Sequence, residues 1–100
     1  MRRNIELETL RSQYRDQILT SAAAHKAGNI RVFGSVVRGE ATETSDVDFL
    51  AHFKKGASLF DVAGLTNDLS NLLGVKVDVI PDDSIHWFIR DKILKESVPL

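Results

Sequence analysis

The residues most suited to chemistry are two aspartates, Asp46 and Asp48, which flank a single valine in an apolar segment. Side chains alternate along a strand, so both carboxylates would lie on one face, about 7 Å apart along the backbone. Such a pair can converge on one divalent ion, and Mg²⁺ commonly takes a few carboxylates together with phosphate oxygens and water. The spacing therefore predicts a metal site on a strand over residues 46–53.

A Gly-Ser pair, Gly34 and Ser35, ends the preceding apolar segment, and ten residues separate it from Asp46. A glycine lets the backbone approach a phosphate closely, and amides at a helix start can donate to anionic oxygens. Arg38 falls on the same side of the following helical turn and offers a planar cationic fork for phosphate. It could equally pair with Asp46 or Glu40 as part of the scaffold, and the sequence leaves both interpretations open.

A third carboxylate is predicted on another strand, because Asp78 interrupts the β-branched segment 75–80. A third acid would allow a second ion, and two ions can activate an attacking oxygen while stabilising the leaving one. His52 is interpreted as a partly exposed strand end, with a metal or base role as the minor alternative. Solvation explains the acids on helix faces or in a turn: Asp61, Asp68, Asp82 and Asp83.

The elements that would position these residues follow from hydrophobic periodicity and from capping signals. The first helix is expected to stop at Gly28, and a later helix begins at Ser58, with an acidic capping partner at Asp61 and a stop at Gly74. The expected order is helix 6–27, strand 30–33, helical turn 35–38, loop 40–45, strand 46–53, helix 59–73, strand 75–80 and helix 84–97.

This order indicates an α+β fold with a small mixed three-stranded sheet and helices packed on one side. The helical crossover between the second and third strands makes those two parallel. The connection between the first and second strands is too short for such a crossover, so these strands are expected to be antiparallel. Without a linker or internal repeat, residues 1–100 are expected to form one domain.

The last helix is expected to bury the side formed by Ile85, Phe88, Ile89 and Ile93. Trp87 and Phe88 are adjacent in sequence, so they cannot both face one core with the other apolar residues of a single helix. At least one of them is expected to be exposed, where it could meet a partner, and a generously buried helix is the equal alternative.

Composition narrows the classes of function. A net charge of −1 over 100 residues lacks the basic excess of a protein that grips long nucleic acid through many phosphates. The absence of cysteine excludes disulfides and thiolate zinc sites and is compatible with a reducing cytoplasm. No apolar run is long enough to cross a membrane, so we expect a soluble, cytoplasmic protein.

The segment from Gly34 to Gly39, followed by Ser45, Asp46, Val47 and Asp48, resembles the signature of the DNA polymerase β-like nucleotidyltransferase superfamily. Over nearly its full length the chain is similar to the minimal nucleotidyltransferases, small proteins often paired with a HEPN-domain partner as antitoxin and toxin. The resemblance implies transfer of AMP from ATP to a hydroxyl, with release of pyrophosphate. In paired systems the acceptor would be a tyrosine of the HEPN toxin, which the modification neutralises.

The same resemblance implies a role for each candidate residue. Asp46 and Asp48 would bind two catalytic Mg²⁺ ions, and Asp78 would be the third acid, on one metal or as a base towards the acceptor hydroxyl. Gly34 and Ser35 would hold the triphosphate. Val37 stands where a small alanine is expected, and it would crowd the turn without removing a ligand.

Two other functions remain to be weighed against this one. A non-catalytic antitoxin could keep the fold and neutralise its toxin by binding alone, although the presence of all three acids and the Gly-Ser pair argues against it. Transfer to a small molecule is disfavoured, since the chain has no spare domain to form an acceptor pocket.

Overall fold

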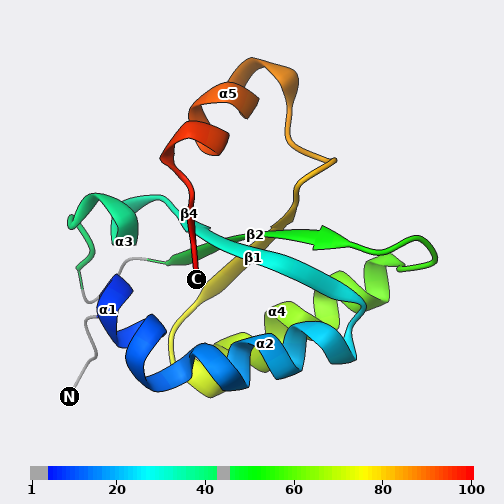
Figure 1. Ribbon diagram of the computed structural model, residues 1–100, viewed down its shortest axis with the longest axis horizontal. Coiled ribbons are helices and arrows are strands. Elements are labelled where there is room, and N and C mark those ends of the chain that lie inside the picture. Colours follow the sequence, from blue (N-terminus) through cyan, green and yellow to red (C-terminus); the bar gives the residue numbers. More distant parts are fainter. Residues whose placement is uncertain (1–4, 43–45) are drawn as a thin grey trace.

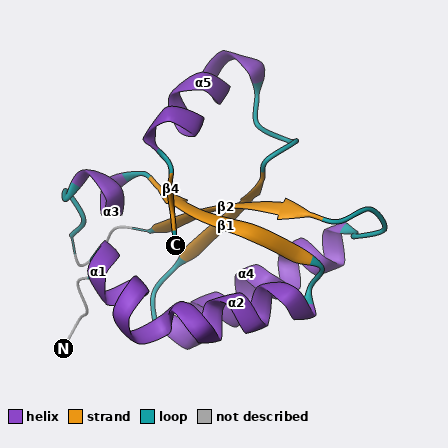
Figure 2. Ribbon diagram, in the orientation of Figure 1, coloured by secondary structure: helices purple, strands orange, loops and turns teal. Residues whose placement is uncertain are grey.

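The computed structural model describes residues 5–42 and 46–100, so the N-terminal residues and part of the expected loop 40–45 lie outside the described residues. A helical N-terminal segment precedes a twisted sheet, and helices lie on both faces of that sheet (Figures 1 and 2). The elements are α1 (Leu7–Thr9), a π-helical turn η1 (Leu10–Tyr14), α2 (Arg15–Ala24), β1 (Ala27–Phe33), α3 (Ser35–Arg38), β2 (Val47–Phe53), α4 (Leu59–Leu73), β3 (Val77–Pro81), α5 (Trp87–Glu96) and β4 (Val98–Pro99).

The sheet has four strands in the order β3-β2-β1-β4, and the expectation of three strands was wrong. The antiparallel β1–β2 pair and the parallel β2–β3 pair are confirmed. The added strand β4 pairs antiparallel with β1, and the Leu100 N–H donates to the Ile30 carbonyl at 3.1 Å. Strand β4 has only two residues, one of them Pro99, so it shows no alternating pattern that would predict a strand. It is a strand because the chain returns to the free edge of β1 and pairs there.

The main core lies between the sheet and the layer formed by α2 and α4. Alternation along β2 is confirmed, since Val47, Phe49 and Ala51 are all fully buried on this face. Helix α4 has the predicted bounds and begins with the predicted capping box of Ser58 and Asp61. The helical side chains that are fully buried in this core are Leu10, Ile18, Ala22, Leu65, Leu69 and Leu73.

Helix α5 lies across the opposite face of the sheet, so the expectation that the helices pack on one side was wrong for this helix (Figure 1). Ile85 and Ile93 form a second small core with Phe33 and Leu50. Leu50 lies on the same face of β2 as Asp48, and it is fully buried. An apolar side chain on that face requires a cover, which α5 and the segment before it provide.

The first helical segment ends earlier than expected, because β1 starts earlier. Helix α2 ends at Ala24, and Lys26 adopts a positive φ of 61° at the turn that was expected at Gly28. Gly28 instead belongs to β1 and pairs with His52. Pairing with β2 therefore extends the strand through a glycine that would otherwise end a helix.

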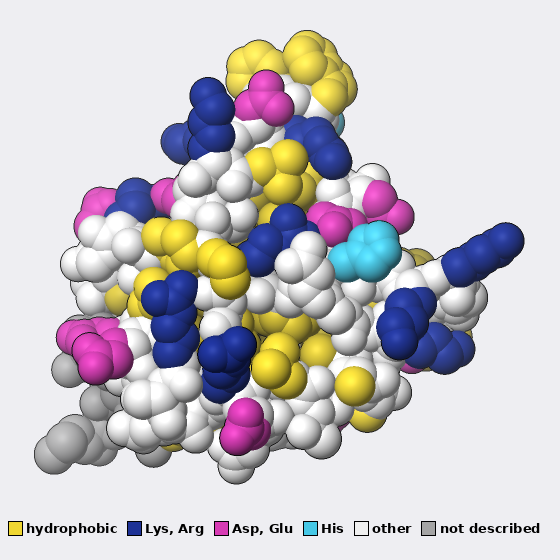
Figure 3. Space-filling model, viewed as in Figure 1, with side chains coloured by type: hydrophobic (Ala, Val, Ile, Leu, Met, Phe, Trp, Pro, Cys, Tyr) yellow, Lys and Arg dark blue, Asp and Glu magenta, His cyan; other side chains and the backbone are white. Residues whose placement is uncertain are grey.

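Several large apolar side chains are exposed at the starts of α4 and α5. Trp87 and Phe88 are 79% and 76% exposed, which confirms that at least one of them is at the surface. Phe88 and Ile89, the latter 45% exposed, are therefore not buried as expected. Figure 3 shows hydrophobic side chains gathered over the outer end of α5. Leu59 and Phe60 are similarly exposed at the start of α4. In the part of the chain that the structure describes, no helix has the length and apolar character needed to span a membrane.

Candidate functional site

The pairing of β2 with β3 brings Asp48 and Asp78 together as direct neighbours in the register. Neighbouring strands lie about 4.8 Å apart, and adjacent residues of a parallel pair project from the same face. This is the face opposite the main core, because Val47, Phe49, Val77 and Val79 point the other way.

Asp46 stands immediately before β2, two residues from Asp48, and its Oδ2 lies 3.6 Å from the Lys76 Nζ. It interacts electrostatically with Asp48, as does Asp78. The structure thus brings the three predicted acids to the same end of two adjacent strands. Lys76, which lies within the expected strand 75–80, is an added partner for Asp46 that the sequence did not indicate.

The electrostatics of this cluster favour a bound cation. Burial, followed by the charges of Asp78 and Asp46, raises the pKa of Asp48 to about 6, although Arg38 acts in the opposite direction. Like charges that are close together disfavour the ionised form of each member, and a cation would relieve this repulsion. Ionisation of all three carboxylates without a cation therefore costs free energy, and a divalent ion would reduce this cost.

Gly34 lies directly against this cluster at the end of β1. Its φ of 83° and ψ of −154° fall in a region that residues with a side chain rarely adopt. A Cβ added at Gly34 would lie 2.3 Å from Asp48 Oδ2, so a side chain at this position would displace the Asp48 carboxylate. Both the backbone conformation and the contact with Asp48 therefore require glycine here.

The short helix α3 follows Gly34 and forms as predicted. The Gly34 carbonyl accepts hydrogen bonds from the N–H groups of Val37 and Arg38, at 3.1 and 3.2 Å. Gly39 ends the helix in the left-handed conformation. The Val37 side chain, which was expected to crowd the turn, instead packs against the main core. Ser35, at the start of α3, is half-buried beside the acids.

Arg38 is held by two carboxylates. Its Nε donates to Glu40 Oε1 at 2.8 Å, and its Nη1 donates to Glu96 Oε1. Glu40 was one of the two scaffold partners that the sequence allowed for Arg38, whereas the other, Asp46, forms an ion pair with Lys76. With the Arg38 side chain 47% exposed, the guanidinium remains at the surface of the site.

Glu96 is a residue of this site that the sequence did not indicate. Its second oxygen, Oε2, accepts a hydrogen bond from the Gly34 N–H at 3.1 Å. Burial raises the pKa of Glu96, but the bonds from Arg38 and the Gly34 amide outweigh it and hold the pKa below its usual range. Because 58 residues separate Glu96 from Arg38, no local pattern could reveal the pair.

A family model for the nucleotidyltransferase domain matches residues 15–100, which include all of these side chains. This chain belongs to the nucleotidyltransferase domain family. Among its relatives, a Methanocaldococcus jannaschii protein assigned as a protein adenylyltransferase is 38% identical over 87% of this chain and 94% of its own length. The protein adenylyltransferase MntA of Thermococcus cleftensis is 36% identical over 93% of this chain and 91% of its own length.

Solved structures agree with this family assignment. A structure assigned as a minimal nucleotidyltransferase superimposes with a TM-score of 0.83 and 45% sequence identity, covering 96% of this chain and 97% of that chain. A toxin–antitoxin structure determined with AMP-PNP has a TM-score of 0.74 at 18% identity, covering 86% of this chain and 71% of that chain. The latter likeness shows a shared fold, and the former supports the minimal nucleotidyltransferase type.

The donor chemistry of this candidate site fits magnesium. Carboxylate oxygens are the ligands that Mg²⁺ prefers, and burial together with the charges of Asp78 and Asp46 raises the pKa of Asp48, so a cation would favour its ionised form. Within residues 5–42 and 46–100, no three acidic or histidine side chains already form a ready-made metal-binding group. The side chains of Asp46, Asp48 and Asp78 would therefore have to rotate towards a shared ion.

His52 and Asp82 lie away from the three acids. His52 Nδ1 is 3.2 Å from Asp82 Oδ1, and Asp82 Oδ2 accepts from Arg31 Nη2 at 3.0 Å. The interpretation of Asp82 as a simply solvated acid was wrong, since its carboxylate is bonded by two side chains. His52, 60% exposed, fits the expected strand end.

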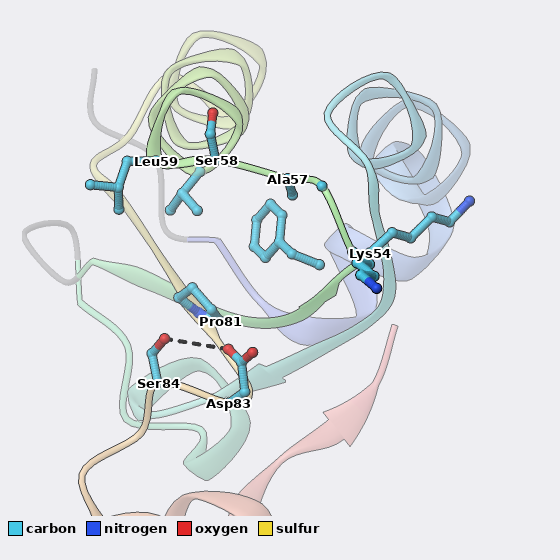
Figure 4. Close-up of a pocket in the computed structure, with 11 residues that line it drawn as sticks. Lys54, Ala57, Ser58, Leu59, Pro81, Asp83 and Ser84 are labelled. Atoms are coloured by element: carbon cyan, nitrogen blue, oxygen red, sulfur yellow. Dashed lines mark hydrogen bonds between the residues drawn. The ribbon is translucent and has the colours of Figure 1, made fainter.

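A pocket of about 400 Å³ lies at the other end of β2 and β3 from the acids (Figure 4). It extends between Phe53, Leu59 and Pro81, and Figure 4 shows Asp83 and Ser84 at its edge. Phe53 follows Asp48 by five residues, or about 17 Å along an extended strand. None of the candidate residues lines this pocket, so it is not the predicted nucleotide site.

Proposed function

We propose that this protein is an Mg²⁺-dependent protein adenylyltransferase that transfers AMP from ATP to a hydroxyl of a partner protein. The observation that carries the proposal is the contact set around Asp48, with Asp78 beside it in the register and Gly34 against its carboxylate. The family match and the names of the relatives that match most of this chain support the same activity.

In this reaction the acceptor oxygen attacks the α-phosphorus of ATP, the bond between the α-phosphorus and the bridging oxygen breaks, and pyrophosphate leaves. Asp46, Asp48 and Asp78 would hold the Mg²⁺ ions. When bound, the ions supply positive charge that offsets the triphosphate and the developing negative charge. Asp78 is exposed, so it can also take the proton of the acceptor hydroxyl.

The phosphates would be held at the start of α3. Gly34 keeps the backbone free of a side chain next to Asp48, and Ser35 contributes a hydroxyl and an amide at that point. Arg38 adds a guanidinium whose plane is fixed by Glu40 and Glu96. These groups bind and orient the triphosphate next to the acids, which lowers the entropic part of the barrier.

We propose a HEPN-domain toxin as the partner and one of its tyrosines as the acceptor, so that the transfer makes this protein an antitoxin. The resemblance of this chain to the minimal nucleotidyltransferases implies pairing with a HEPN-domain toxin. A protein of the same fold also occurs in a toxin–antitoxin structure. The exposed Trp87 and Phe88 on α5 offer an apolar surface for such a partner.

The test is to incubate the protein with ATP, Mg²⁺ and the candidate toxin, and to measure the intact mass of the toxin. We expect an increase of one AMP, mapped to a tyrosine by peptide fragmentation. Asp48→Asn should give no increase, and the exposed Asp16→Asn on α2 should behave as wild type. If wild type adds no AMP and still binds and silences the toxin, the protein is a non-catalytic antitoxin.

A further inference from the structure

Glu96, the last residue of α5, connects three parts of the candidate site. Its Oε2 accepts from the Gly34 N–H at 3.1 Å, and its Oε1 accepts from Arg38 Nη1. The Glu96 side chain is only 18% exposed, compared with 47% for Arg38. One carboxylate therefore joins the end of α5 to both ends of the turn that follows β1.

We propose that Glu96 is a positioning residue for the nucleotide site, which holds the turn from Gly34 to Arg38 in the conformation that binds the triphosphate. This inference rests on the proposed function, because it assigns a role within the same site. Glu96 would act through Gly34 and Arg38 and would not itself touch the nucleotide.

The bond to Gly34 matters because this glycine is buried. A buried N–H without an acceptor loses its bonds to water without replacement, so the turn would relax if the carboxylate were removed. Gly34 also lies against Asp48 Oδ2, where even a single added carbon would clash. A relaxed turn would therefore shift the backbone relative to a carboxylate of the metal cluster.

The bond to Arg38 fixes the direction of the guanidinium. Arg38 donates from Nε to Glu40 and from Nη1 to Glu96, two bonds on different nitrogens of one rigid plane. A guanidinium has five N–H donors, so this arrangement orients the plane and leaves others for a phosphate. Glu40 alone would leave the plane free to turn about a single bond, and Glu40 is 59% exposed.

A competing role for Glu96 makes the opposite prediction. A carboxylate bonded to a glycine amide and an arginine could occupy the place of a phosphate oxygen, and ATP would then have to displace it. Removal of the carboxylate would in that case strengthen ATP binding. Under the positioning role, its removal weakens ATP binding.

The experiment measures binding of Mg²⁺-ATP by calorimetry, and the KM and kcat of AMP transfer, for wild type, Glu96→Gln, Glu96→Asp and Glu40→Gln. We expect Glu96→Gln to weaken ATP binding and raise KM about tenfold, with a smaller change in kcat. Glu96→Asp keeps the charge and should recover part of the loss. Glu40→Gln should weaken binding less than Glu96→Gln does, because the Glu40 carboxylate accepts an exposed bond from Arg38, whereas Glu96 also accepts from the buried Gly34 N–H.

Unchanged or stronger ATP binding by Glu96→Gln would overturn the inference, as would an equal effect in Glu40→Gln. A lower melting temperature with unchanged ATP binding, measured well below that temperature, would reduce Glu96 to a structural role and would also overturn it. Failure of wild type to bind ATP would instead remove the proposed function, so the two failures are distinguishable.

Discussion

Gly34 and Asp48 are in such close contact that a Cβ on the glycine would lie 2.3 Å from the Asp48 Oδ2. Gly34 directly follows β1, and Asp48 lies on the adjacent strand β2, where it pairs with Phe33, the residue before Gly34. The contact joins the Gly-Ser pair to the acids in space.

Gly34→Ala should therefore destabilise the protein by about 3 kcal/mol, through both the positive φ and the clash. Gly39→Ala is the matched control, because Gly39 also has a positive φ, of 72°, but a Cβ there meets nothing within 4 Å. The control should cost about 1 kcal/mol. Urea unfolding of both variants checks the difference, and equal costs would show that the contact with Asp48 contributes nothing.

Asp48→Asn should stabilise the metal-free protein at neutral pH while it abolishes AMP transfer. The folded-state pKa of about 6 lies above the ordinary value of 3.8, so the folded state binds this proton more tightly than the unfolded state. The contribution of Asp48 to the free energy of unfolding is therefore greatest below about pH 4. This contribution is lost as the pH rises through 6.

At pH 7.5 the free energy of unfolding of Asp48→Asn should exceed that of wild type by about 1 kcal/mol, after allowance for solvent screening. At low pH the difference between variant and wild type should be smaller. Thermal unfolding in EDTA at several pH values measures it. Added Mg²⁺ should raise the melting temperature of wild type and have a weaker effect on the variant. A variant less stable than wild type at pH 7.5 would contradict the repulsion between the acids.

Gly64 in α4 makes room for His25 at the end of α2, and a Cβ there would lie 2.6 Å from the His25 Cε1. The His25 Nε2 lies 2.7 Å from Asp68 Oδ2, a bond that a displaced ring would lose. Gly64→Ala should therefore cost about 1 kcal/mol in wild type but stabilise a His25→Ala background by about 1 kcal/mol. A double-mutant cycle by urea unfolding measures this coupling, and additive effects would contradict it.

Leu100→Ala should destabilise the protein by about 2–3 kcal/mol, because Leu100 is 6% exposed and belongs to the main core. Pro99→Ala is the control, since Pro99 is exposed and offers only its carbonyl, to Arg11. Thermal unfolding compares the two. A similar small effect in both variants would show that β4 does not anchor the chain after α5.

Trp87→Ser and Phe88→Ser should leave the free energy of unfolding within about 0.5 kcal/mol of wild type, because both side chains are exposed. Under the proposed function, the pair should lower AMP transfer to the toxin at least about tenfold and leave ATP binding unchanged. Phe60→Ser is a control of similar exposure on α4. An equal loss of transfer in this control would contradict a partner surface on α5.

Local pattern was sufficient for much of the fold. Helix α4 has the predicted bounds because its capping box and its glycine stop are encoded within one segment. The alternation of Asp48 with Val47 and Phe49 predicted the face of β2 that carries the acids, since side-chain direction in a strand follows from the backbone alone. The antiparallel and parallel pairings followed from the lengths of the connections.

The tertiary structure decided what depends on distant segments. Strand β4 exists because the chain returns to the edge of β1, and α5 covers the second face because Leu50 must be buried there. Glu96 reaches Gly34 and Arg38 from the far end of the chain, and His25 explains Gly64. The sequence by itself determined the residue types and the faces of the candidate site, whereas only packing between distant elements determined their partners, because such contacts leave no periodic pattern.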